Sequence, residues 1–342
     1  MATVTWDGSS STDYGTAANW DTGSVPTSSD DVIIADVTNN CVLDGSRSVN
    51  SFTVESGGDF NGNTEMLTVV GENSSGFAVN IDGVIVGTTT DITITTPTTT
   101  TIDLTATSGN VRHLTINHAS ANVFYSGATT LTGNLNITLG TLNCSHAAGN
   151  FTVQGNTSIG PASGSADQAT LNATDCNTSL GSGHTSSFAL IVNQGGTFDG
   201  GSGNHTIGSI EVKNNSNAKM DFTSGNTTVD SEKTGDNRNI VTNVNSTVTH
   251  SNGTIIMTFA GNTEISWEST TSGNEGPYNF TVNHASAIQR SRRSPFRVLN
   301  DLTITAGEYN TLSGDSGADL DLTVTGTTTI GPGSGVADQA TL

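Results

Sequence analysis

The stretch IGPASGSADQATL at residues 159–171 returns almost unchanged as IGPGSGVADQATL at residues 330–342. Two shorter stretches upstream recur in the same order, namely NHASA at 117–121 and 283–287, and NLNIT at 134–138 with DLTIT at 301–305. The offset between the copies drifts from 166 to 167 to 171 residues, which small loop insertions explain. A long internal repeat of this kind predicts an elongated architecture built from similar, stacked units.

Short runs of apolar, small polar and apolar residues dominate the rest of the chain. Typical runs are LTI at residues 114–116, FTV at 151–153 and LTI at 302–304. This period of two is that of a β-strand, and Thr at the centre is a β-branched strand former. Clusters of Gly, Asn, Asp and Ser come after the runs and favour turns. Strands about every 20 residues, joined by turns, predict an all-β parallel β-helix. An array of antiparallel β-sandwich modules is the alternative.

The composition agrees with a thin core. Only 32% of the 342 residues are hydrophobic and 5% are aromatic, less than a compact globule carries. Disorder does not explain these values, because the apolar residues lie in alternating runs. Acidic residues number 31 against 10 basic ones, giving a net charge of −21. Such a surface repels nucleic acid and anionic lipid, whereas its many hydroxyl and amide groups suit contact with glycans.

The opening carries TWDG at residues 5–8, ANWDTGSVP at 18–26 and DDVII at 30–34. This order resembles the first rung of autotransporter-passenger-like β-helix proteins and of large β-helical phage appendage proteins. The resemblance implies a terminal cap. We expect Trp6 and Trp20 to plug the open end of the first coil, and Pro26 to form the turn into the first rung.

The repeats suggest four segments: a capping rung (1–35), solenoid coils (36–112), a first long repeat (113–278) and the start of a second (279–342). The second copy stops inside the repeated unit, so we expect the native polypeptide to be longer. The opening has neither a basic nor an apolar leader segment, and no run approaches the roughly 20 apolar residues of a membrane span. Membrane insertion is therefore not expected.

Candidate metal ligands are sparse. Asp315, Asp319 and Asp321 form a weak candidate for Ca²⁺, as do Asp30 and Asp31, although acidic turn residues are the simpler interpretation. No other cofactor is predicted.

Glycines, histidines and cysteines give no firmer metal site. The stretch GGSGNHTI at residues 200–207 is similar to the calcium-binding nonapeptide of RTX β-rolls, but His205 replaces the metal-binding Asp, which favours a Gly-rich turn. His118 and His284 occupy equivalent repeat positions and are expected to be stacked or surface turn residues. The three cysteines are expected to be small buried residues, although two of them could pair.

An arginine-rich stretch interrupts this acidic chain. Arg290, Arg292, Arg293 and Arg297 are four of the ten basic residues, and they replace residues 122–129 of the first copy, which contain none. The stretch is either a solvated loop or a docking patch for an acidic neighbouring subunit, for which the rest of the surface has the right sign.

Together these features predict a non-catalytic structural or adhesive protein of a virion surface, such as a bacteriophage tail, head or capsid fibre. We expect a homo-oligomer that meets other virion subunits and contacts host surface glycans. The alternatives are a bacterial extracellular adhesin, sheath or S-layer-like filament protein, and a β-helical polysaccharide depolymerase.

Overall fold

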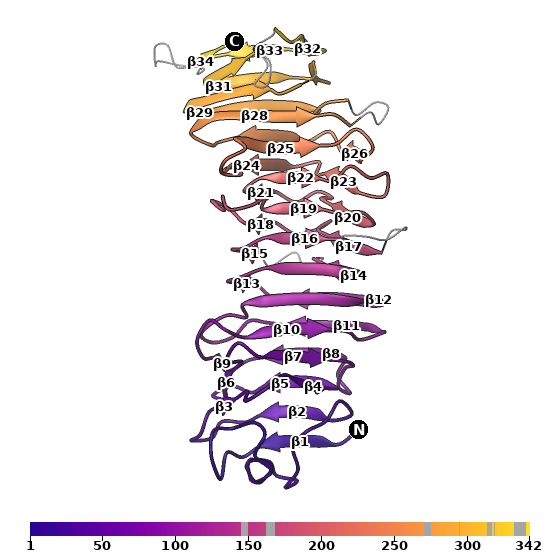
Figure 1. Ribbon diagram of the computed structural model, residues 1–342, viewed down its shortest axis with the longest axis vertical. Coiled ribbons are helices and arrows are strands. Elements are labelled where there is room, and N and C mark those ends of the chain that lie inside the picture. The colour runs from indigo at the N-terminus through magenta and orange to yellow at the C-terminus, as the bar shows by residue number, and fades with distance from the viewer. Residues whose placement is uncertain are drawn as a thin grey trace. The chain divides into compact units, whose positions relative to one another are not determined.

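The computed structural model describes residues 1–144, 150–161, 168–269, 275–293, 295–312, 317, 319–331 and 340–342. The chain divides into two compact units: unit 1 comprises residues 1–154 and 168–171, and unit 2 comprises residues 155–167 and 172–342. Each unit is a stack of coils made from short strands (Figure 1). The registers described between named strands are all parallel. The prediction of a parallel β-solenoid is therefore confirmed, and the antiparallel sandwich alternative is wrong.

Unit 1 presents its strands in three rows. The first row contains β1 (Thr3–Trp6), β2 (Asp31–Ile34), β5 (Ser51–Val54), β8 (Phe77–Ile81) and β11 (Thr99–Asp103). The second contains β4 (Arg47–Val49), β7 (Met66–Val69), β10 (Asp91–Ile94), β12 (His113–Ser126) and β14 (Leu135–Asn143). The third contains β3 (Cys41–Val42), β6 (Asp59–Asn61) and β9 (Val84–Ile85), while β13 (Thr129–Leu131) pairs with β15 (Phe151–Val153) and β17 spans Ala169–Asn172.

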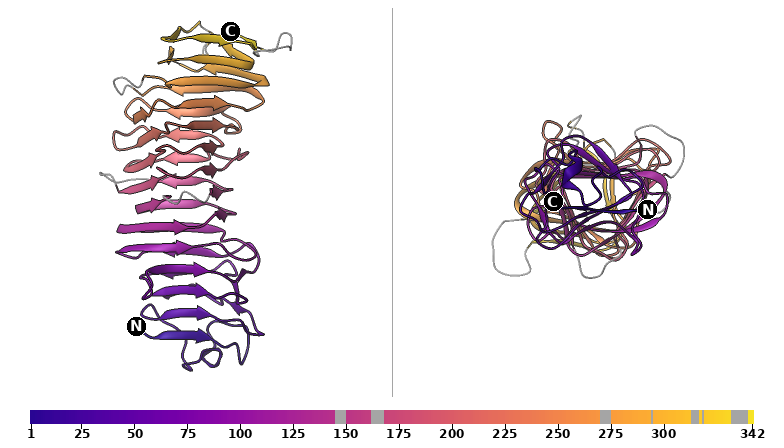
Figure 2. Two further views of the ribbon diagram at one scale, coloured as in Figure 1. Left: turned by 180° about the vertical axis from the view of Figure 1, so that it is seen from behind. Right: turned by 90° about the horizontal axis from the view of Figure 1, so that it is seen from below.

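Unit 2 repeats the plan, and Figure 2 shows its strands side by side from behind. One row contains β16 (Thr157–Ile159), β19 (Leu190–Val192), β22 (Ile210–Val212), β25 (Arg238–Thr242) and β28 (Gly261–Trp267). Another contains β18 (Thr178–Leu180), β21 (His205–Ile207), β24 (Asn226–Val229), β27 (Thr254–Met257), β29 (Asn279–Ser291), β31 (Leu302–Asn310) and β33 (Thr328–Ile330). The remaining strands are β20 (Gly196–Asp199), β23 (Lys219–Phe222), β26 (Thr247–His250), β30 (Phe296–Val298), β32 (Leu322–Val324) and β34 (Ala340–Thr341).

Register matching puts like residues on top of one another. In the second row of unit 1, one stack of fully buried side chains is formed by Val49, Val69, Ile94, Ile116 and Ile137. The neighbouring positions point the other way and form a polar stack of Ser48, Thr68, Thr93, Thr115 and Asn136. The period of two seen in the sequence therefore becomes a division between core and surface. Each buried Val or Ile contributes roughly 1.5–3 kcal/mol.

The first coil of unit 1 is filled by aromatic residues. Trp6 and Trp20 are 0% and 2% exposed, and their rings meet edge to face at 5.1 Å. Tyr14 packs edge to face against Trp20 at 4.7 Å. Each indole N–H is satisfied, since Trp6 Nε1 donates to the Asn39 carbonyl at 2.8 Å and Trp20 Nε1 to that of Tyr14 at 2.8 Å. Pro26 is buried. Trp6, Trp20 and Pro26 are the residues that the sequence suggested for the cap.

A buried asparagine, which the sequence analysis did not single out, organises the same region. Asn19 ends the short 3-10 helix η1 (Ala17–Asn19) and is 0% exposed. Its Oδ1 accepts the backbone N–H groups of Ser10 and Ser11 at 2.8 and 2.7 Å. Its Nδ2 donates to Ser11 Oγ at 3.0 Å and to the Asp13 carbonyl at 2.9 Å. All hydrogen-bonding positions of the amide are therefore used.

The described first strands of the two sequence repeats fold alike. The strands β12 and β29 share the same succession of buried and exposed positions, and both turn a corner with a register shift after Ile116 and Val282. At the corner His118 Nδ1 accepts the Ser120 N–H at 3.2 Å, and His284 accepts that of Ser286 at 3.1 Å. The prediction of surface turn histidines thus agrees with the structure. Each corner also has a glycine packed against it, Gly140 or Gly307.

We predict that Asn19→Ala lowers the stability of unit 1 by roughly 1–3 kcal/mol, because two backbone donors and a carbonyl lose their partner. Thermal unfolding followed by circular dichroism, together with proteolysis of the first coil, measures the effect. Asn117→Ala, at an exposed position of the same unit, is the control and should unfold like the unmodified protein. An equal loss in both variants would contradict the role given to Asn19.

We also predict that Gly140→Ala destabilises unit 1 more than Gly76→Ala. Both glycines have positive φ, 93° and 82°, so both variants bear the same backbone strain of about 1 kcal/mol. Only at Gly140 would the new Cβ meet other atoms, at 2.5 Å from the His118 carbonyl, whereas Gly76 has nothing within 4 Å. Parallel denaturant titrations of the two variants check this, and similar midpoints would refute the close contact.

Candidate functional site

A wide depression lies in unit 2, beside the arginine-rich stretch. Its volume is about 650 Å³. It is lined by Val244, Trp267, Glu268, Ser269, Glu275, Arg293, Pro295 and Arg297. The volume falls within the roughly 300–1,000 Å³ of small-molecule sites, and the lining combines apolar surface with a few charged groups, as such sites do.

The strand β30 sets the position of one wall. Phe296 and Val298 are buried, so the alternation of the strand turns Arg297 outward. The Phe296 ring stacks on Tyr309 at 5.5 Å and meets Phe280 edge to face at 5.2 Å. Its backbone N–H donates to the Asp321 carbonyl at 2.9 Å. An aromatic anchor thus fixes the backbone that carries Arg297.

A glycine holds the neighbouring segment against this wall. A Cβ at Gly276 would lie 1.8 Å from the Arg297 carbonyl oxygen, so no other residue fits there without moving the backbone. Next to it, the Leu299 N–H donates to the Pro277 carbonyl at 2.9 Å, and the Asn300 N–H to that of Tyr278 at 2.8 Å. The segment that begins with Glu275 is therefore clamped to the strand that carries Arg297.

The floor comes from β28 and the residues after it. Trp267 is only 5% exposed and stacks on Phe222 at 5.6 Å, so the ring is fixed and only part of it reaches the depression. Glu268 Oε1 accepts the Ser266 hydroxyl at 2.7 Å. Ser269 Oγ donates to the Ser246 carbonyl at 2.9 Å. The floor is therefore rigid before any ligand arrives.

The four arginines named from the sequence are divided between two places. Arg293 and Arg297 line the depression, where Arg297 Nη1 lies 3.9 Å from Glu275 Oε2. Arg290 lies on β29 in register with Glu264, and Arg292 Nε lies 3.7 Å from Glu264 Oε2. Whether the stretch docks a subunit stays a prediction.

The other lining residues were not found from the sequence. Trp267, Glu268 and Glu275 look like ordinary residues of a strand and a turn, and only the stacking of coils brings them beside the arginines. A run of basic residues in an acidic chain was the sequence signal for this site. It identified only the wall that carries Arg293 and Arg297.

A pair of carboxylates lies on another face of unit 2. Asp199 and Asp221 are in register on β20 and β23, and Asp221 faces Thr249 on the next coil. Burial raises the pKa of Asp221, and the charge of Asp199 raises it further, while a hydrogen bond from Thr249 lowers it. Asp199 Oδ1 accepts the Gly201 N–H at 3.1 Å. This is a stacked pair in which one carboxylate is held in a partly buried environment.

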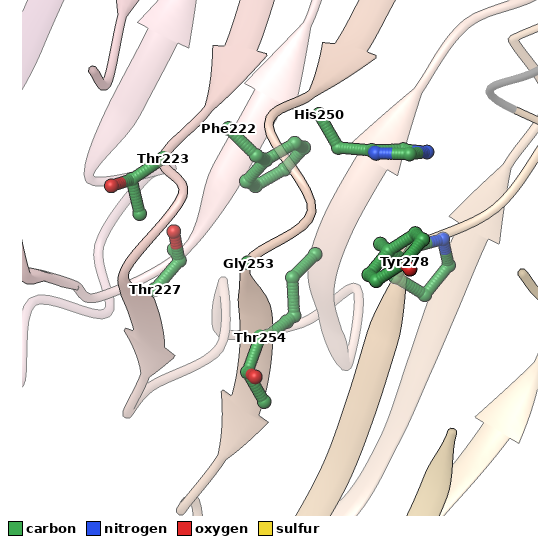
Figure 3. Close-up of a pocket in the computed structure, with 9 residues that line it drawn as sticks. Phe222, Thr223, Thr227, His250, Gly253, Thr254 and Tyr278 are labelled. Carbon is green, nitrogen blue, oxygen red and sulfur yellow. The ribbon is translucent and has the colours of Figure 1, made fainter. Parts of the chain in front are cut away.

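A smaller cavity nearby is shown in Figure 3. It has a volume of about 10 Å³ and lies between Phe222, His250 and Tyr278, with Thr223 and Thr227 along one side. The His250 and Tyr278 rings are 5.4 Å apart. This space is about that of one water molecule, so the cavity is a packing feature and no ligand site.

Of the suggested metal ligands, Asp319 and Asp321 take part in backbone contacts with other segments. Asp315 lies outside the described residues. The Asp321 carbonyl accepts the Phe296 N–H at 2.9 Å, and Asp319 forms an antiparallel bridge with Leu312. In the part of the chain that the structure describes, no group of three His, Cys, Asp or Glu residues is arranged to hold a metal ion.

The other acidic candidates have structural partners. Asp31 Oδ1 accepts Asn50 Nδ2 at 2.7 Å and the Ser51 hydroxyl at 2.6 Å. Asp30 Oδ2 accepts the N–H and the hydroxyl of Thr27 at 2.9 and 2.7 Å. The two carboxylates thus serve different turns.

His205 is a core residue. It is 1% exposed, with Nε2 at 2.7 Å from the Gly200 carbonyl and Nδ1 at 2.9 Å from Thr178 Oγ1. Burial lowers its pKa, so the neutral ring is favoured. The Gly-rich turn interpretation of residues 200–207 agrees with this placement. Cys41, Cys144 and Cys176 are all buried.

No protein-family model matches this sequence, no curated protein is significantly similar to it, and no solved structure matches its fold significantly. Among the residues that the structure describes, no helix is long and apolar enough to cross a membrane.

We predict that Asp221→Asn stabilises unit 2 at pH 7 and has no effect near pH 3. Because the folded-state pKa of Asp221 is raised above its usual 3.8, the folded state binds the proton more tightly than the unfolded state. Stability is therefore lost as pH rises from about 4 through the raised pKa, and the neutral amide avoids that loss. Urea unfolding at the two pH values measures it. A destabilised variant at pH 7 would contradict the burial argument.

Proposed function

We propose that this chain is a structural and adhesive surface protein of a virion, forming part of a bacteriophage tail, head or capsid fibre. The observation that carries the proposal is the register-matched stacking of polar side chains outside and apolar side chains inside each unit. In unit 2 the outward stack has one apolar member, Ile256, and otherwise contains Ser179, Thr206, Thr228, Thr281, Thr303 and Thr329.

Such stacks suit a durable surface. Strands inside a row, such as β7, β10, β21 and β24, are hydrogen-bonded to the coils before and after them, so their backbone is satisfied without reliance on water. The exposed rows consist mainly of hydroxyl and amide groups, which form hydrogen bonds with the hydroxyl groups of glycans. The net charge of −21 keeps the chain soluble and limits binding to nucleic acid. We infer that it works as a homo-oligomer among other virion subunits.

The same features support a bacterial extracellular adhesin or filament protein. The location of the protein, on virus particles or on cells, distinguishes this alternative from the virion proposal. A polysaccharide depolymerase is favoured by one observation, the stacked pair Asp199 and Asp221. Adjacent strands are about 4.8 Å apart, close to the roughly 5 Å between the carboxylates of retaining glycosidases. In that case Asp221, with its raised pKa, would be the general acid, and Asp221→Asn would abolish reducing-sugar release from a polysaccharide substrate.

We predict that an antibody raised against the chain labels released virus particles from the source culture. Immunogold electron microscopy on density-purified particles is the measurement, with the pre-immune serum as control. Label on free filaments or on the cell surface, with unlabelled particles, would replace the virion proposal with the adhesin alternative.

A further inference from the structure

We propose that the depression beside β30 binds an acidic saccharide, a sugar chain that carries carboxylate or sulfate groups. The inference rests on the proposed contact with glycans, though not on a virion location. Three properties of the lining carry it: a pair of arginines, a pair of carboxylates and an apolar surface, all around one space of about 650 Å³.

The arginines supply recognition of an anion. Arg293 and Arg297 line the depression in a chain whose net charge is −21, so two of its ten basic residues meet at this one space. The guanidinium group presents a planar fork that matches a carboxylate or sulfate with two hydrogen bonds.

Arg297 can exchange its internal ion pair for an ion pair with a ligand anion. Its partner Glu275 lies 3.9 Å away, and the two side chains are 48% and 38% exposed. An ion pair this open contributes little to stability, because solvent screens it. A ligand carboxylate that reaches Arg297 therefore competes with a weak internal interaction.

The carboxylates argue for a saccharide and against an acidic peptide. Glu268 and Glu275 accept hydrogen bonds from hydroxyl groups, which an acidic saccharide carries and a run of acidic side chains does not. The apolar part of the lining is formed by Trp267, Pro295 and Val244, the last being 45% exposed. Such a surface packs against the C–H face of a sugar ring. An anion, hydroxyl groups and an apolar face occur together in acidic sugars.

The site is also preorganised. The Phe296 anchor, the Gly276 contact and the stacking of Trp267 on Phe222 fix both wall and floor. The backbone that carries Arg297 and the ring of Trp267 therefore need little ordering when a ligand binds, which lowers the entropic cost.

We predict that the full chain binds tetragalacturonate in isothermal titration calorimetry and that the fully methyl-esterified tetramer, which has the same rings without the charges, does not bind. Arg297→Gln and Arg293→Gln should each weaken binding about tenfold or more, since a charged hydrogen bond is lost. Lys213→Gln is the matched control: it removes one positive charge from the same unit, where Lys213 is 45% exposed and paired with Glu211, and should leave binding unchanged.

A chondroitin sulfate tetrasaccharide, which carries sulfate groups in addition to carboxylates, tests whether sulfate strengthens binding, and preference for either ligand supports the site. Circular dichroism of each variant separates lost binding from lost folding. Tighter binding of tetraglutamate than of both acidic saccharides, equal binding of the methyl ester, or unchanged binding by folded Arg297→Gln overturns the proposal. So does the absence of binding to both acidic saccharides at millimolar concentration, whatever the immunogold labelling shows about location.

Discussion

A coil of this protein buries its apolar side chains against the other sides of the same coil and against the coils directly before and after it. Each strand must therefore place its inward residues over those of its neighbour, as Val69, Ile94 and Ile116 do in unit 1. A shift by one residue would exchange core and surface along the whole strand. This constraint explains why turns and loops vary in length while the three-residue runs of apolar, small polar and apolar residues are kept. It also explains why differences in charge and shape are confined to loops and outward positions.

Much of the fold could be predicted because that constraint leaves a local pattern. The LTI run at residues 114–116 is readable as a strand, and the repeat near residue 159 indicates stacking. Asn19 could not be predicted, since a fully satisfied buried amide and a surface turn residue have the same sequence signature. His205 resembled a substituted metal ligand, and only the fold shows both ring nitrogens satisfied inside the core.

The candidate site could be predicted only in part, because a local sequence pattern does not tell which residues the stacking of coils brings together. The arginines stand out by composition, so one wall was visible in the sequence. Trp267 and Glu275 precede them in the chain, and their proximity depends on how many residues each turn contains, which the loops decide. The stacked Asp199 and Asp221 illustrate the same limit, because parallel register makes neighbours of two side chains that a whole coil of sequence separates.

The two corners at β12 and β29 have a consequence for how the molecule can change. Each corner is built from the same histidine–serine contact and the same closely packed glycine, but one continues into neutral sequence and the other into arginines. The corner backbone is thus compatible with either kind of downstream sequence. The loop sequence after this corner can therefore change while the strands that carry it stay the same. Binding specificity can diverge at this point between the two sequence repeats.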